Sequence, residues 1–283
     1  MFRRILVASD LSPAAEQIIN MIYSFHVLGT EEIVLVHCLD IRDAGLLSET
    51  LIPLLQPEVD REVAKLNQLG FVTTGEIRIG SPGLEINRVA RERDCSIIVI
   101  GSHGYSMDQN TSLGGVATTI LHTATRPVLV VKITSPPSEI SWNPLNHILY
   151  PTDFSDNAKV AFTYLETLVR CGAEKVTLLH VQDKIIGKHL VDRLAEFNKI
   201  DETLLLELRD QLVNEGDVEV NIEIPFGLVA QEIINRIKTD EVSLVVMGTQ
   251  GRGYIGEVFL GSVSNKVVRY SPVPVLLVPL VHS

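Results

Sequence analysis

Glycine and hydroxyl residues cluster after an apolar segment in the C-terminal half of the 283-residue chain. Residues 243–247 are followed by Gly-Thr-Gln-Gly at 248–251 and, after nine more residues, by Gly-Ser-Val-Ser at 261–264. Glycine lets the main chain approach a ligand closely, and the amides that open a following helix attract anions. The hydroxyls of Ser262 and Ser264 can add hydrogen-bond donors. The pattern therefore predicts a site that binds phosphate.

The spacing excludes two other phosphate loops and gives no sign of covalent catalysis. No Gly-x-Gly-x-x-Gly is followed about twenty positions later by an acidic residue, and no Gly-Lys-Ser/Thr occurs. Arg252 and Lys266 are the basic residues near the predicted phosphate. No Gly-x-Ser-x-Gly elbow and no Cys and His pair placed by a motif is present. We therefore expect binding and assign no catalytic residue.

The sequence contains an internal repeat. Residues 5–12 match residues 148–155 in type and order. Further along, Gly80, Gly101, Gly114 and Pro127 correspond to Gly227, Gly248, Gly261 and Pro274. The prolines at 136 and 137 interrupt regular hydrogen bonding between the copies. We therefore expect two domains, 1–138 and 139–283.

Each copy alternates short β-branched segments with longer segments of helical period, as α/β domains with a parallel sheet do. Strands are expected at 4–8, 32–38, 73–79, 96–101 and 128–132, and again at 147–150, 176–181, 218–224, 243–248 and 275–278. Ser12 and Ser155 are predicted to cap the helix that follows the first strand of each copy. A leucine-rich stripe over 190–212 is predicted to pack in the core of the second copy.

Composition excludes several classes of protein. Apolar residues make up 46% of the chain and charged residues 21%, as in ordinary globular domains. The formal charge of −11 disfavours nucleic acid and anionic membrane surfaces as partners. No apolar segment is long enough to span a bilayer, and no signal-peptide pattern is present, so a cytoplasmic location is expected.

Three features of the second copy together resemble the universal stress protein family. They are the spacing Gly-x2-Gly-x9-Gly-Ser, the turn Pro151-Thr152-Asp153 after the first strand, and His180-Val181 after the second. The resemblance covers essentially the whole chain, as two tandem domains. It implies two doubly wound five-stranded parallel sheets of order 3-2-1-4-5, the adenine nucleotide alpha hydrolase-like fold. It also implies a stress-response or signalling protein that binds ATP, ADP or AMP.

The same resemblance assigns roles to residues of the second copy. The turn at Pro151 and Thr152 and the main chain of Val181 would flank adenine, and Met247 would line the pocket. Asp153 would approach the ribose or a magnesium ion on the phosphates, although it also fits a turn carboxylate at the start of a helix. The ribose and phosphates would be wrapped by Gly248, Gly251, Arg252, Gly261, Ser262, Val263 and Ser264.

The first copy departs from the motif where it would meet phosphate. Gly101, Gly104 and Gly114 keep the glycine spacing, but Gly115 and Ala117 stand in place of the two serines. Asp108 adds a negative charge to this loop. We therefore expect the second domain to hold the nucleotide, and the first to hold it weakly or not at all.

Two other functions remain open from the sequence. A nucleotide beside Asp153 and magnesium could be hydrolysed slowly, which would make the protein a weak ATPase or phosphotransferase. Alternatively, both domains could form a nucleotide-free dimerisation scaffold. The family resemblance favours pairing through the last strand of each copy, 127–132 and 274–278, within one chain, and a homodimer beyond that.

Overall fold

The computed structural model describes residues 1–45, 48–103, 113–133, 142–183, 194–251 and 260–280. Contacts within the chain define two compact units, Met1–Trp142 and Asn143–Ser283. The boundary expected at residue 138 falls in segment 134–141, outside the described residues.

The first unit contains a parallel sheet whose strand order is β3-β2-β1-β4-β5. Its strands are β1 (Arg4–Ser9), β2 (Glu32–Asp40), β3 (Val72–Gly80), β4 (Ile97–Gly101) and β5 (Val128–Val131). The central strand β1 pairs with β2 and β4, and Ile5, Leu6 and Val7 in it are almost fully buried. Because β1 is covered on both faces of the sheet, its sequence is continuously apolar at these positions.

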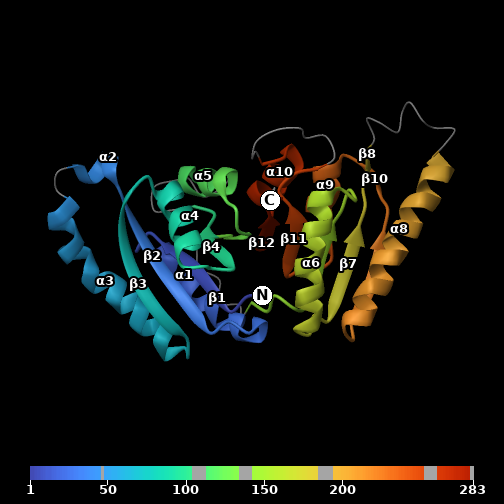
Figure 1. The fold of residues 1–283 in the computed structure, drawn as a ribbon. Coiled ribbons are helices and arrows are strands. Elements are labelled where there is room, and N and C mark those ends of the chain that lie inside the picture. Colours follow the sequence, from blue (N-terminus) through green and yellow to red (C-terminus); the bar gives the residue numbers. More distant parts are fainter. Residues whose placement is uncertain (46–47, 104–112, 134–141, 184–193, 252–259, 281–283) are drawn as a thin grey trace. The chain divides into compact units, whose positions relative to one another are not determined.

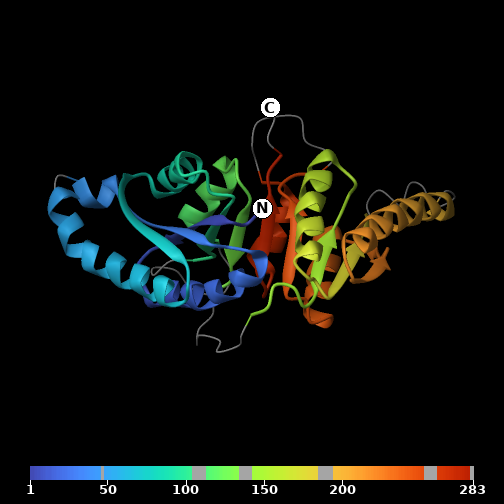
Figure 2. The same ribbon diagram turned by 60° about the horizontal axis from the view of Figure 1, so that its bottom comes forward.

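Helices cover both faces of this sheet (Figures 1 and 2). One face is covered by α1 (Pro13–Ile22) and α3 (Ser48–Gln68), which contact each other, and the other by α4 (Pro82–Glu92) and α5 (Gly115–Thr123). A 3₁₀ helix, Tyr23–Leu28, continues α1, and a short helix α2 (Ile41–Ala44) follows β2. Apolar side chains on the inner side of each helix complete the core.

The second unit repeats this arrangement with the strand order β9-β7-β6-β11-β12. Its strands are β6 (Ile148–Pro151), β7 (Lys175–Leu179), β9 (Glu219–Glu223), β11 (Leu244–Gly248) and β12 (Val275–Val278). Its helices are α6 (Asp156–Arg170), α8 (Leu194–Glu215), α9 (Val229–Thr239) and α10 (Ser262–Tyr270). Both units thus confirm the predicted α/β fold and the order 3-2-1-4-5.

The two units differ at the ends of their second and third strands. In the first unit β2 and β3 stay paired to Asp40 and Gly80. In the second unit the pairing of β7 with β9 stops at Leu179 and resumes in a separate two-stranded sheet of β8 (Gln182–Asp183) and β10 (Phe226–Gly227). Pro225 lies in the gap and has no amide hydrogen to donate. The sequence analysis did not predict this second sheet.

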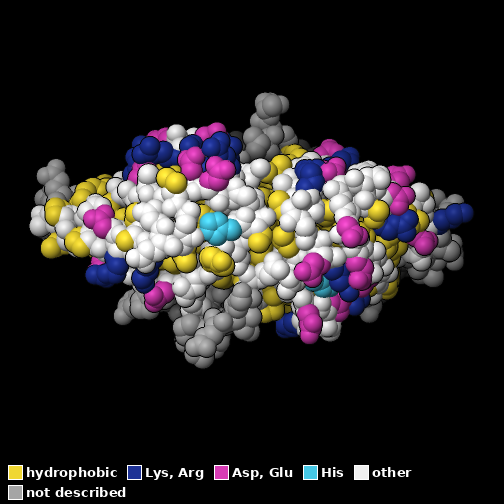
Figure 3. Space-filling model, turned by 90° about the horizontal axis from the view of Figure 1, so that it is seen from below, with side chains coloured by type: hydrophobic (Ala, Val, Ile, Leu, Met, Phe, Trp, Pro, Cys, Tyr) yellow, Lys and Arg dark blue, Asp and Glu magenta, His cyan; other side chains and the backbone are white. Residues whose placement is uncertain are grey.

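Many charged side chains on the surface form ion pairs. On the face that Figure 3 shows, Lys and Arg side chains are intermingled with Asp and Glu. Arg88 with Glu85 and Arg170 with Glu215 are examples of these ion pairs, and partly exposed pairs of this kind add little stability. Among the described residues, no helix combines the length and the apolar character that crossing a membrane requires.

Candidate functional site

A cavity of about 490 Å³ lies at the carboxyl ends of the strands in the second unit. Eleven of the twelve residues predicted for the nucleotide site line it, although they come from four separate segments of the chain. They are Pro151, Thr152, Asp153, Val181, Met247, Gly248, Gly251, Gly261, Ser262, Val263 and Ser264. Arg252, the twelfth, lies outside the described residues.

The turn after β6 forms one wall of the cavity. The Thr152 hydroxyl accepts a hydrogen bond from Phe154 N at 3.0 Å, and Asp153 Oδ1 accepts one from Ser155 N at 3.0 Å. Phe154 has a φ of 60°, a left-handed backbone conformation that residues other than glycine rarely adopt. The Ser155 hydroxyl then caps α6 by accepting from Ala158 N at 3.2 Å, as predicted.

The glycine loop forms another part of the cavity wall, where α10 begins. Gly261 N donates to Thr249 O at 2.7 Å, which closes the loop onto the end of β11. The bond from Asn265 N to Gly261 O is the first of the helical pattern. The amides of Ser262, Val263 and Ser264 therefore precede the helical ladder at the positive end of α10. Amides in this position bind anions through the main chain.

Glycine is required at two positions where the walls meet. A Cβ atom at Gly251 would lie 2.6 Å from Asp153 Oδ2, and one at Gly248 would lie 2.7 Å from Asn157 Oδ1. Both distances are shorter than any ordinary contact, so a side chain at either position would displace a polar partner. The glycine loop is thus packed directly against the turn that carries Asp153.

The two predicted phosphate hydroxyls differ in their surroundings. Ser262, the first residue of α10, is exposed at the rim of the cavity. The Ser264 hydroxyl is buried and donates to Gly248 O at 3.0 Å. In this structure the single proton of the Ser264 hydroxyl ties α10 to the end of β11, and a hydrogen bond from Ser264 to phosphate stays a prediction.

Asn157 on α6 organises the loop and was missed by the sequence analysis. Its Oδ1 accepts from Gln250 N at 2.7 Å and from the Thr249 hydroxyl at 3.3 Å, and its Nδ2 donates to Val278 O at 2.9 Å. The side chain is buried, with 3% of its surface exposed. The sequence signal that could have indicated its role is a difference between the copies: the first copy has Ala14 where the second has Asn157.

At the other end of the cavity, His180 connects the turn with α8. His180 Nδ1 donates to Thr152 O at 2.8 Å, and its ring lies 4.8 Å from the Phe154 ring. His180 Nε2 is 3.5 Å from Asp201 Oδ2, which also accepts from Gln182 Nε2 at 3.0 Å. Asp201 was not predicted as part of the site.

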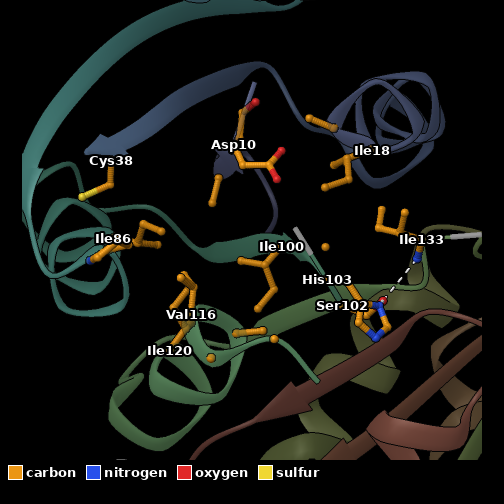
Figure 4. A pocket seen from close by; sticks show the side chains of 18 of the residues that line it. Asp10, Ile18, Cys38, Ile86, Ile100, Ser102, His103, Val116, Ile120 and Ile133 are labelled. Atoms are coloured by element: carbon orange, nitrogen blue, oxygen red, sulfur yellow. Dashed lines mark hydrogen bonds between the residues drawn. The ribbon is translucent and has the colours of Figure 1, made fainter. Parts of the chain in front are cut away.

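A smaller cavity, of about 240 Å³, occupies the corresponding place in the first unit (Figure 4). Its turn repeats the second one: Leu11 has a φ of 57°, and Ser9 and Asp10 accept from the amides of Leu11 and Ser12. His37 Nδ1 donates to Ser9 O at 3.0 Å, as His180 does to Thr152. The repeat therefore extends to individual hydrogen bonds.

The first glycine loop is held differently because no asparagine braces it. The Ser102 hydroxyl accepts from Ile133 N at 3.2 Å and hydrogen-bonds His103 Nδ1 at 2.8 Å. His103 is buried and lines the cavity at the position of Gln250 in the second unit. Asp108, expected to add charge here, lies outside the described residues.

Cys38 lines the first cavity, but its thiol is not set up for chemistry. Burial raises the pKa of this thiol to about 11, so it stays protonated near neutral pH. The described residues contain no group of three or more His, Cys, Asp or Glu side chains that could hold a metal ion. Neither observation points to nucleophilic or metal-centred catalysis in this part of the chain.

Comparisons with known proteins agree with the duplicated fold. A sequence profile of the universal stress protein family matches residues 1–132 and again 144–279. A universal stress protein of Methanocaldococcus jannaschii is 33% identical over 150 residues, which are 46% of this chain and 93% of that protein. One from Bacillus subtilis is 29% identical over 145 residues, 47% of this chain and 98% of that protein.

A solved structure shares the fold along the whole chain. The crystal structure of a universal stress protein from Archaeoglobus fulgidus covers 99% of both chains with a TM-score of 0.77 and 23% sequence identity. Since the family profile also matches each of the two units, the chain belongs to the universal stress protein family and carries two of its domains in tandem.

Proposed function

We propose that the protein binds an adenine nucleotide in its second unit, as part of a cytoplasmic stress-response or signalling function. The observation that carries this proposal is the cavity that is lined both by the start of α10 and by the turn of Asp153. Its volume of about 490 Å³ is within the range of roughly 300–1,000 Å³ of small-molecule sites. The predicted roles of the lining residues remain part of the proposal.

The two ends of the cavity suit the two ends of a nucleotide. Met247, Val229 and Ile233 give an apolar surface near Val181, which suits a planar base. The amides of Ser262, Val263 and Ser264 and the exposed Ser262 hydroxyl suit phosphate. The carboxylate of Asp153 lies between these ends and suits ribose hydroxyls, which are hydrogen-bond donors.

Magnesium fits this site only together with phosphate. Asp153 Oδ1 already accepts from Ser155 N, and the described residues offer no group of three metal-binding side chains. Magnesium commonly takes one or two carboxylates and completes its shell with phosphate oxygens and water. Asp153 would therefore hold the ion as one ligand, with the nucleotide supplying the others.

A thermal-shift titration with ATP, ADP, AMP and GTP tests the proposal, with and without magnesium. A ligand that binds only the folded state adds about 2.7 kcal/mol to the free energy of unfolding at one hundred times its Kd. We expect a stabilising shift with the adenine nucleotides and a smaller one with GTP. The absence of any shift with all four would contradict the proposal.

A pair of matched variants locates the binding. Gly261→Asp places a carboxylate at the start of α10, where an added Cβ would lie 3.1 Å from Thr249 O. We expect this variant to lose the nucleotide-induced thermal shift. Gly114→Asp is the corresponding change in the first unit, where the nearest atom to a Cβ is Ser102 O at 3.5 Å. We expect this variant to keep the nucleotide-induced shift.

Slow hydrolysis is the alternative that kinetics can separate from binding. Asp153 is the single candidate base that the sequence offered, and its Oδ1 is occupied by the turn. We therefore expect phosphate release from ATP no faster than in buffer. Release that exceeds buffer and disappears in Asp153→Ala would instead favour a weak ATPase.

A further inference from the structure

A carboxylate lies on the inner face of α8, among leucines. Positions 201, 205, 208 and 212 follow one another at helical spacing, which places them on one face of the helix. Leu205 and Leu212 are fully buried there, and the side chain of Asp201 on the same face is only 15% exposed. The neighbouring Ile200 is 54% exposed. The beginning of α8 therefore has a charged residue facing inward and an apolar residue facing outward, although charged residues seldom lie inside unless they are paired.

The first unit has an apolar residue at this position. Leu66 in α3 and Leu212 in α8 are fully buried, and each lies four residues before a glycine. Aligned on these leucines, the two helices pair Asp201 with Leu55. The fold therefore accepts a leucine here, and the carboxylate is a feature of the second unit that requires an explanation of its own.

Two side chains from the segment after β7 meet this carboxylate. Gln182 Nε2, in β8, donates to Asp201 Oδ2 at 3.0 Å, and His180 Nε2 is 3.5 Å from the same oxygen. The main-chain amides of His180 and Gln182 are already bonded to carbonyls of segment 223–225, at 3.0 and 2.9 Å. Figure 1 shows the beginning of α8 at the same end of the second unit as β8. Asp201 thus ties the helix to a segment whose main chain is fixed.

His180 extends this contact to the cavity. Its Nδ1 donates to Thr152 O at 2.8 Å, and its ring lies 4.8 Å from the ring of Phe154. Thr152 N donates to Leu179 O at 2.9 Å, so both main-chain polar groups of Thr152 have partners. With the carboxylate at Nε2, the His180 ring has a polar neighbour at each nitrogen, which restricts its rotation about the bond to Thr152. The turn after β6 is therefore held from α8 through one imidazole ring.

The beginning of α8 depends on this contact in turn. Residues 198–200, 202 and 203 are exposed, and Leu204 is half-buried. Among the described residues of α8, Leu205 is the first that is fully buried. The packing of residues 198–204 against the unit therefore relies on Asp201 more than on apolar burial.

We propose that Asp201 is a positioning residue for nucleotide binding in the second unit. It does not line the cavity, and it acts through His180, which holds the main chain of Thr152 at the base-binding end. Nucleotide binding stabilises the beginning of α8 in return, because the two effects are one coupling free energy. The inference rests on the proposed function for the identity of the ligand.

Calorimetric titration of the full chain with ATP tests the positioning role. Asp201→Leu introduces the residue of the first unit, and we expect it to bind ATP about fivefold more weakly or worse, the effect of one lost hydrogen bond. The thermal stability of this variant without ligand should not fall, because leucine continues the apolar face of α8. A purely structural role would lower stability and leave the affinity unchanged. Asp201→Ala replaces this variant if it does not fold.

Two further variants separate position from charge. Asp201→Asn keeps an oxygen for Gln182 and gains an amide that can donate to Nε2 of the neutral His180 ring, so we expect its ATP affinity within about twofold of the wild type. Asp210→Leu is the control, since Asp210 lies exposed on the same helix beside Arg209, and it should bind ATP as the wild type does. Unchanged affinity in Asp201→Leu, or an equal loss in Asp201→Asn, would overturn the positioning role.

Amide hydrogen exchange measures the same coupling from the side of the helix. ATP should slow exchange at residues 198–204 of the wild type, and Asp201→Leu should lose this protection. Equal protection in the variant would overturn the inference.

ATP binding by the wild type judges the proposed function separately. Without ligand, Asp201→Leu should exchange faster than the wild type and Asp210→Leu at the amides of Phe154 and Ser155, which the turn after β6 holds. If the wild type does not bind ATP, the proposed function fails, and this ligand-free comparison decides whether Asp201 positions the turn. Unchanged exchange at both amides would overturn the inference whether or not ATP binds.

Discussion

The Asn157 side chain braces the described part of the second glycine loop. It accepts two hydrogen bonds from residues 249 and 250 and donates one to Val278 O while buried. Asn157→Ala removes these three hydrogen bonds from a buried position, which costs about 1–3 kcal/mol. We expect urea denaturation to show this loss in the free energy of unfolding, together with weaker nucleotide binding.

Asn235→Ala is the control for this change. Asn235 lies exposed on α9, where it accepts from Gln231 Nε2. Its removal should change the free energy of unfolding by less than about 0.5 kcal/mol. Equal effects of the two substitutions would argue against a special role for Asn157.

The lowered pKa of the buried His147 leads to a prediction of how the stability of the second unit depends on pH. Its Nδ1 donates to Asp240 O at 2.7 Å and its Nε2 accepts from the Thr177 hydroxyl at 2.8 Å, an arrangement of the neutral ring. Burial lowers the pKa of His147, and Lys175 nearby acts in the same direction while Asp240 and Glu219 oppose it. The unfolded chain therefore binds a proton more readily than the folded one.

The direction in which the free energy of unfolding changes with pH follows from this difference in proton binding. As pH falls below about 6.5, the ordinary histidine pKa, the unfolded state gains a proton first and the free energy of unfolding decreases. Denaturation of the wild type and His147→Gln between about pH 7.5 and 5 checks this. The variant should lose less stability over that interval, and a steeper loss would contradict the argument.

The helix α8 carries a large share of the second core. Leu205 and Leu212 are fully buried, whereas Val213 on the same helix is 53% exposed. Leu205→Ala should lower the free energy of unfolding by about 2–5 kcal/mol, because it removes buried methyl groups and leaves a cavity. Val213→Ala should have an effect below about 0.5 kcal/mol, and urea denaturation compares the two.

At the scale of elements, the hydrophobic pattern predicted the central strands because strands such as β1, β4 and β11 are buried along their length. Strand ends were less accurate, since they depend on partners: β2 extends to Asp40 because β3 continues beside it to Gly80. The break between β7 and β8 depends on Pro225, forty-odd residues away along the chain, whose effect on a neighbouring strand has no local signal.

The part of the candidate site that lies within one segment of the chain was predicted, because there the spacing of residues in the sequence reflects their positions in the structure. Glycines 248, 251 and 261 fall in one loop, and their positions followed from the repeat and the family resemblance. The bracing by Asn157 and the contact of Asp201 with His180 join separate helices to the loop and turn, so no spacing predicts them. The bond from the Ser264 hydroxyl to Gly248 O was not predicted, because a motif does not show which way a hydroxyl donates.

At the scale of the whole molecule, pairing of the two units through their last strands stays a prediction. Residues 128–131 and 275–278 are apolar strands, each the last in the order of its own unit, and apolar strand edges associate readily. We expect the halves 1–142 and 143–283, expressed separately, to form a complex when mixed. Sedimentation velocity would show it, and two independent sedimenting species would contradict the pairing.

The left-handed residues at Leu11 and Phe154 have a consequence for the rate of ligand capture. Each costs about 1–2 kcal/mol in local backbone energy, yet the turn bonds of its neighbours hold it before any ligand arrives. The turn that contributes to each cavity is thus preorganised, and association requires no conformational ordering of this turn. The observed rate of ligand binding should then rise linearly with ligand concentration, without the slow phase that levels off when a conformational closing step limits binding.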